Sequence, residues 1–134
     1  MIPASNSVMA NNLFKLSIYF ENNYYETTAR KMLERIVPTM DYPSAFSNWM
    51  NLYLKLSANN KELAISGRDA LSFAQKINKE YHPNLVLVGS TKETMIPFLK
   101  NRFSEGKTQF FLCQNKACQL PTIDFEELKK QLLN

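Results

Sequence analysis

The sequence is short of glycine and lacks long apolar runs. It contains three glycines, about a third of the number that ordinary usage would give a chain of 134 residues. Because glycine supplies most left-handed turns, this shortage favours long helices. No apolar run approaches the roughly 20 residues needed to cross a bilayer, and Met1 to Asn6 lack the pattern of a secretory signal. We therefore expect a cytoplasmic protein with no membrane partner.

Histidine and catalytic motifs are scarce as well. His82 is the one histidine, at the end of a predicted helix, where the helix dipole favours it as a surface or capping residue. A zinc site needs about four ligands, and no Ser or Cys nucleophile lies in a recognisable motif. We expect no metal and no cofactor, and no catalytic residue can be assigned.

The charge balance gives little support to a nucleic acid partner. Sixteen Lys and Arg against twelve Asp and Glu give a net charge of +4. No basic cluster is interleaved with exposed aromatic side chains, the pattern typical of nucleic acid surfaces. We expect a solvated surface with a small excess of lysine and no nucleic acid partner.

The first 58 residues predict three amphipathic helices. The first covers about residues 5–20, the second 24–37 up to Pro38, and the third follows Pro43. Five apolar side chains of the first helix lie near one stripe and are expected to face inward: Val8, Met9, Leu13, Leu16 and Phe20. The aromatic side chains of the third helix (Phe46, Trp49 and Tyr53) favour core packing or an interface with further helices over a sugar-stacking platform.

Residues 59–134 predict a small α/β unit. A strand at 62–66, a helix at 70–81 and a strand at 85–89 have the spacing of a βαβ crossover, which implies parallel pairing. A third strand at 108–113 and a C-terminal helix from Asp124 complete it. The predicted fold class is α/β: a helical half, residues 1–58, followed by a three-stranded parallel α/β unit, residues 59–134.

Polar residues follow the predicted strands and suggest a ligand site. Gly67, Arg68, Gly89 and Ser90 come directly after the first two strands, and Gln114 to Lys116 follow the third. Ligands of open parallel sheets bind beyond the carboxyl ends of the strands, so a small anionic ligand could bind there. The alternative is a pair of ordinary βα turns, in which glycine permits the bend and serine caps the helix.

The two cysteines form a Cys-x4-Cys pattern. Cys113 lies at the end of the third strand and Cys118 in the loop that follows it. Thioredoxin-type redox motifs use Cys-x-x-Cys at a helix start, a different geometry. Three alternatives remain open: a disulfide or redox pair, a metal shared between two copies, and two reduced thiols that pack.

Three segments resemble one known family. Pro3 to Val8, Tyr42 to Phe46 and the run Cys113 to Pro121 are similar to sequence motifs of the thioredoxin-domain-containing proteins related to the spermatogenesis-associated thioredoxin-like protein. The cysteine-to-proline run is the most specific of the three, and Ser5 stands where the family pattern has glycine. The resemblance implies a parent that pairs a thioredoxin-like domain with an (α/α)-barrel similar to six-hairpin glycosidases.

The resemblance also implies a role. It makes this chain a non-catalytic C-terminal region whose partners are the thioredoxin-like domain and the remaining barrel, with a homodimer through exposed helices as a further expectation. One alternative makes it part of a carbohydrate-active enzyme, epimerase-like or glycosidase-like, with Asn6 and Ser7 facing the pocket. Another makes Cys113 and Cys118 a thiol redox partner of the thioredoxin-like domain.

Overall fold

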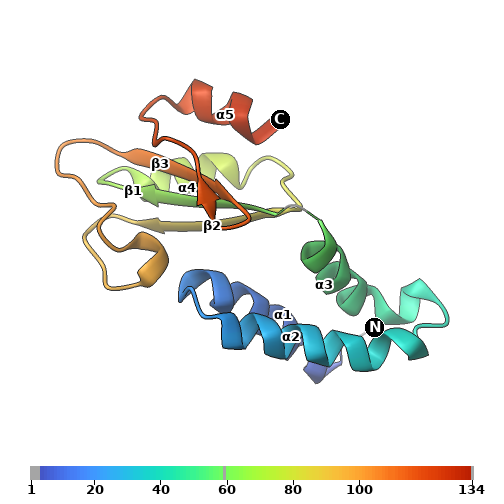
Figure 1. Ribbon diagram of the computed structural model, residues 1–134. Helices are drawn as coiled ribbons and strands as arrows, with labels where there is room; N and C mark the ends of the chain where they lie inside the picture. Colours follow the sequence, from blue (N-terminus) through green and yellow to red (C-terminus); the bar gives the residue numbers. More distant parts are fainter. Residues whose placement is uncertain (1–3, 59, 134) are drawn as a thin grey trace. The chain divides into compact units, whose positions relative to one another are not determined.

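The computed structural model describes residues 4–58 and 60–133, so Pro3 of the first motif and Asn59 lie outside the described residues. The chain divides into two units, Met1–Ala58 and Asn59–Asn134, close to the place where the hydrophobic period changes. The first unit is helical and the second contains a sheet with helices (Figure 1). The predicted α/β class is confirmed.

The described residues of the first unit form three α-helices: α1 (Ser5–Tyr19), α2 (Asn23–Ile36) and α3 (Ser47–Ser57). Glu21, with φ of +50°, lies in the tight link between α1 and α2, and the Asn22 side chain accepts a hydrogen bond from Tyr24 N, which caps α2. The short 3₁₀ turns η1 (Val37–Thr39) and η2 (Pro43–Phe46) follow, each with proline near its start.

The buried face of α1 differs from the predicted one. Its buried residues are Ser7, Ala10, Phe14 and Ser17, whereas the prediction is wrong for three apolar residues that are exposed: Val8 (42%), Met9 (55%) and Phe20 (48%). Small side chains allow close approach of neighbouring helices, and Ala10 of α1 and Ala29 of α2 are both fully buried. The buried face of α1 therefore combines three small side chains with the single large one of Phe14.

The described residues of the second unit form four strands, in the order β2-β1-β3-β4: β1 (Lys61–Ser66), β2 (Leu85–Ser90), β3 (Gln109–Gln114) and β4 (Ala117–Cys118). Its helical elements are α4 (Ala70–Ile77), the 3₁₀ turn η3 (Pro97–Leu99) and α5 (Phe125–Leu133). The β1–α4–β2 crossover is parallel, as predicted.

The expectation of three parallel strands is wrong for the third one. β3 pairs antiparallel with β1, and Gln109 lies opposite Ser66, whose parallel partner is Ser90 at the end of β2. A parallel third strand would need a crossover that returns the chain to the other end of the sheet. Residues 91–108 contain only η3, so β3 starts at the end where β2 stops. A tight turn then adds β4, which was not predicted.

The two faces of the sheet are covered differently. On one face the side chains of β1 and β3, among them Leu63, Ile65 and Phe110, pack with α4 and α5 into the main core. Lys61 Nζ donates to the carbonyl oxygens of Gln131 at 3.1 Å and Leu132 at 2.8 Å, which satisfies the end of α5. The opposite face carries the alternate strand residues and is contacted by η3, whose residues Phe98 and Leu99 are buried.

No helix in the described ranges, residues 4–58 and 60–133, is long and apolar enough to cross a membrane.

Candidate functional site

A disulfide lies at the end of the β3–β4 hairpin. The turn residues Asn115 and Lys116 have φ of +52° and +64°, as in the type I′ turns that suit the twist of two-residue hairpins. This turn places Cys113 directly opposite Cys118, and their sulfur atoms are joined. Of the three alternatives that the sequence left open, the structure therefore has the disulfide pair.

The two halves of the disulfide differ in exposure. Cys113 belongs to β3, an inner strand of the described sheet, and is 1% exposed. Cys118 is exposed and belongs to β4, the outer strand of the described sheet. A molecule approaching from solvent therefore meets Cys118 first.

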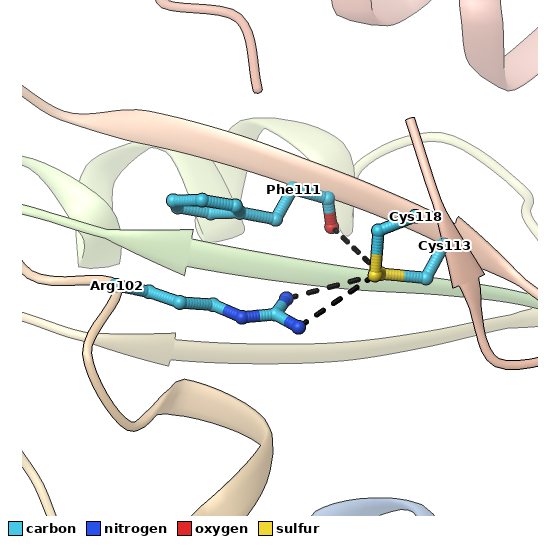
Figure 2. The surroundings of a disulfide bond; sticks show 4 residues. All are labelled: Arg102, Phe111, Cys113 and Cys118. Carbon is cyan, nitrogen blue, oxygen red and sulfur yellow. Dashed lines mark hydrogen bonds between the residues drawn. A yellow bond between two sulfur atoms is a disulfide. The ribbon is translucent and has the colours of Figure 1, made fainter. Parts of the chain in front are cut away.

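Arg102 lies against both sulfur atoms, as Figure 2 shows. Its Nη1 donates to Cys113 Sγ at 3.8 Å and its Nη2 donates to Cys118 Sγ at 3.6 Å. The guanidinium carbon is 4.9 Å from the ring centre of Phe98 and 5.0 Å from that of Phe111. Contacts of a cation with aromatic faces are attractive, so the two rings hold the guanidinium beside the disulfide.

Two other groups on this face would disfavour a thiolate, in contrast to the arginine. The carbonyl oxygen of Phe111 is 3.9 Å from Cys113 Sγ, and its partial negative charge disfavours a thiolate. Glu62 lies opposite Cys113 in the β1–β3 register, so the two side chains project from the same face of the sheet. The guanidinium is a full positive charge at hydrogen-bonding distance from both sulfurs. A reduced cysteine here would have a cation placed to stabilise its thiolate.

Arg102 was missed in the sequence, although the turn could have been found. Arg102 is 11 and 16 residues from the two cysteines, and no local pattern links it to them. The run Gln114-Asn115-Lys116-Ala117 carries a weak hairpin signal, since asparagine tolerates positive φ. With a two-residue turn at that place, the Cys-x4-Cys spacing puts the cysteines opposite each other.

The predicted ligand residues after β1 and β2 lie at one end of the sheet. Gly67 N donates to Ser90 O at 3.1 Å, and residues 107 and 108 cover Gly67 so closely that a Cβ there would lie 2.5 Å from Thr108 Cα. Asp69 N donates to Thr108 Oγ1 at 3.1 Å, so the protein itself occupies the start of α4. Binding of a small anion by Gly67, Arg68, Gly89 and Ser90 stays a prediction.

Residues 114–116 are not part of that group. Because β3 is antiparallel, Gln114 lies opposite Lys61, at the start of β1. The predicted third side of the crevice is therefore at the opposite end of the sheet from Ser66 and Ser90.

Asn6 and Ser7 lie in the first turn of α1. Asn6 is exposed, whereas Ser7 is 1% exposed. The Ser7 hydroxyl donates to Ala4 O at 2.7 Å and accepts from Asn48 Nδ2 at 2.8 Å. These bonds give Ser7 a packing role, and contact of either residue with a sugar stays a prediction.

His82 lines a shallow hollow of about 270 Å³ whose other walls come from residue Glu80 and from α5. Its Nε2 is 3.4 Å from Glu80 Oε2. The polar lining is mixed in charge, with Glu126, Lys129 and Lys130. In the part of the chain that the structure describes, no three His, Cys, Asp or Glu side chains are grouped so that they could hold a metal ion.

Comparison with known proteins finds mammalian relatives of much greater length. The chain is 27% identical over 142 aligned residues to human spermatogenesis-associated protein 20, and 26% and 27% identical to the proteins of the same name from Mus musculus and Rattus norvegicus. Each alignment covers 97% of this chain and 18% of the relative. No family model matches the chain and no solved structure matches it. The chain is thus similar, over nearly all of its length, to about a fifth of spermatogenesis-associated protein 20.

Proposed function

We propose that this chain is a non-catalytic C-terminal region that completes the fold of a larger protein. The observation that carries the proposal is the exposure of large apolar side chains on α1, at its C-cap and on α2, among them Met9 (55%), Phe20 (48%) and Tyr24 (73%). Exposed apolar surface of this kind marks an interface. The chain spans only 18% of its human relative, so a protein of that length has further segments that could cover this surface.

In this proposal the larger protein carries a thioredoxin-like domain and an (α/α)-barrel, and α1 to α3 are the last helices of that barrel. The motif resemblance and the run of three consecutive helices support the assignment. A helix that packs inside a barrel buries side chains on more than one face. In this proposal the exposed residues of α1 pack against further helices of the same protein.

A substitution in two contexts tests this proposal. Met9→Asp is made in the chain alone and in the full-length protein that contains it, with Tyr81→Asp as the control, since Tyr81 is 89% exposed in the sheet unit. Met9→Asp should be nearly neutral in the chain alone and should destabilise the full-length protein by roughly 1–3 kcal/mol, as for a charge placed in an interface. Equal effects in the two contexts would show that no other segment covers Met9.

A second candidate function is reversible thiol–disulfide exchange at Cys113 and Cys118. The observation that favours it is the guanidinium of Arg102, which lies within 3.8 Å of both sulfur atoms. Cations beside cysteines lower the pKa of the thiol and so make the reduced state easier to form and more reactive. In a larger protein with a thioredoxin-like domain, that domain is the proposed partner.

A redox titration of the native chain tests the second candidate. The chain is equilibrated with mixtures of reduced and oxidised dithiothreitol, and free thiols are counted by alkylation and mass measurement. A single reversible two-electron transition under native conditions is expected, and a variant with both cysteines replaced by serine provides the blank. Reduction that occurs only in denaturant, or thiols that do not pair again, would remove the redox function.

A further inference from the structure

We infer that exchange at this disulfide has a direction: an external thiolate attacks Cys118 Sγ, and Cys113 leaves as a buried thiolate beside Arg102. The inference rests on the second candidate function, reversible exchange, and adds which sulfur is attacked and which residue stabilises the leaving group. It follows from the unequal burial of the two cysteines and from the position of one cation.

Access decides which sulfur is attacked. Exchange requires a thiolate to approach one sulfur along the line of the S–S bond, from the side away from the other sulfur. Cys118 is exposed and lies on β4, the outer strand of the described sheet. Cys113 is 1% exposed and its strand is flanked by β1 and β4. An approach to Cys113 would have to displace part of the sheet unit, whereas Cys118 meets solvent.

The chemical steps balance with a dithiol as the reductant. Its first thiolate forms a bond to Cys118 Sγ, the S–S bond breaks, and the electron pair of that bond leaves with Cys113 as a thiolate. The second thiol of the reductant then loses its proton and attacks the first, which closes the oxidised reductant and releases Cys118. Two electrons pass from the dithiol to the cysteines, and protons from the reductant or from solvent return the cysteines to thiols.

Arg102 is the positioning residue for the leaving group. Its Nη1 already donates to Cys113 Sγ in the disulfide, at 3.8 Å, and it needs no movement to stabilise the charge that develops there. The Phe111 carbonyl and the Glu62 side chain on the same face disfavour a negative charge on that sulfur. The contact with the rings of Phe98 and Phe111 keeps the guanidinium in place as the S–S bond breaks.

Trapping the mixed disulfide tests the direction. The native chain is mixed briefly with glutathione, a monothiol, and exchange is stopped with acid. The freed cysteine is then alkylated with a maleimide at mildly acidic pH before peptide mapping. Glutathione is expected on Cys118 and the alkyl group on Cys113, in at least about tenfold excess over the reverse pattern, because the rate depends on which sulfur is accessible. An excess of glutathione on Cys113 would overturn the inference and leave reversible exchange intact. No mixed disulfide at any time would remove the exchange function itself.

Substitution of Arg102 tests the leaving-group role. Arg102→Gln should slow the release of Cys113 several-fold, because the rate of exchange follows a fraction of the change in leaving-group pKa. It should also shift the pH midpoint of Cys113 titration in a Cys118→Ser background upward. Arg102→Lys, which keeps the charge, should restore part of the rate. Lys100→Gln removes an exposed positive charge two residues away and serves as the control.

The controls also separate charge from folding. If Arg102→Gln fails to fold, the comparison of Arg102→Lys with the native chain still reports the effect of geometry at constant charge, and glutathione mapping of the native chain needs no substitution at all. Equal release rates and equal pH midpoints for the native chain, Arg102→Gln and Lys100→Gln would overturn the role of Arg102.

Discussion

The side-chain amide of Asn48 donates a hydrogen bond of 2.8 Å to the hydroxyl of Ser7 and so joins α3 to α1. Asn11 strengthens the same junction, because its Nδ2 lies 2.9 Å from Ser7 O and 3.0 Å from Asn48 O. Ser7 is 1% exposed, and a buried polar group of this kind is stable only when its partners are present.

We expect Ser7→Ala to destabilise the helical unit by roughly 1–3 kcal/mol, because Asn48 loses its acceptor in a part-buried position. Trp49 is the single tryptophan of the chain and lies in α3, so its fluorescence during urea unfolding reports on this unit. Ser5→Ala, at an exposed position in the same turn, is the matched control and should be nearly neutral. Equal losses for the two variants would contradict the role of the Asn48 contact.

Lys55 should make the helical unit more stable at alkaline pH. Burial, with the nearby charge of Lys15 as a second cause, lowers the pKa of Lys55 below the ordinary value of 10.5. The unfolded chain therefore holds the Lys55 proton to higher pH than the folded chain does. The free energy of unfolding should rise as pH increases between the two pKa values, and it should gain nothing from this group at lower pH.

Lys15→Gln tests this assignment. Removal of the like charge should move the pKa of Lys55 back toward 10.5, although burial keeps part of the shift. The measurement is a pH titration of the Lys55 side chain by NMR, with Lys31→Gln on α2 as a control of the same charge change. A pKa for Lys55 that Lys15→Gln leaves unmoved would exclude Lys15 as a cause.

Gly67 and Gly106 should respond unequally to alanine. Both have positive φ, +140° and +84°. A Cβ at Gly67 would lie 2.5 Å from Thr108 Cα and 2.6 Å from Lys107 O, whereas nothing lies within 4 Å of a Cβ at Gly106. Gly106→Ala should cost about 1 kcal/mol of backbone strain, and Gly67→Ala should cost more than about 3 kcal/mol because the neighbouring backbone must also move. Thermal unfolding followed by circular dichroism measures both, and similar losses would mean that the contact with residues 107 and 108 is absent.

The final turn of α5 should loosen when Lys61 is shortened. Lys61 Nζ donates to two carbonyl oxygens at the end of this helix, and such contacts stabilise a helix end by roughly 0.3–1 kcal/mol or more when partly buried. Lys61→Met should speed amide hydrogen exchange in residues 129–133 several-fold without a comparable change in β1. Lys130→Met, an exposed lysine of α5, is the control. Unchanged exchange in Lys61→Met would show that the helix end does not depend on this lysine.

The sequence predicted those helices, strands and helix boundaries that depend on residues close together in the chain. The apolar run from Leu85 to Val88 and the helix length before it predict the parallel β1–α4–β2 unit, because few connections of that length are possible. Pro38 follows the end of α2 and Pro43 begins the 3₁₀ turn before α3, because proline has no amide hydrogen to donate within a helix.

The features that the sequence did not predict depend on contacts between distant residues. The direction of β3 depends on whether residues 91–108 return the chain to the opposite end of the sheet. No pattern within the strand itself indicates this. The buried face of α1 depends on its packing with α2, where Ala10 and Ala29 are fully buried and Met9 is 55% exposed. Arg102 reaches the cysteines through the fold, so no spacing in the sequence could have paired them.

The unequal cover of the sheet in the second unit has a dynamic consequence. One face is packed by the helices α4 and α5, whereas the face that carries the disulfide is contacted by residues 91–108, in which η3 is the one helical turn among the described elements. Segments with few helical hydrogen bonds open at lower free energy than packed helices do. An opening of residues 91–108 would carry Arg102 away from Cys113 while the strands stay paired. Release of Cys113 as a thiolate would then be fastest while this segment is closed, because only the closed segment places the Arg102 cation beside the sulfur.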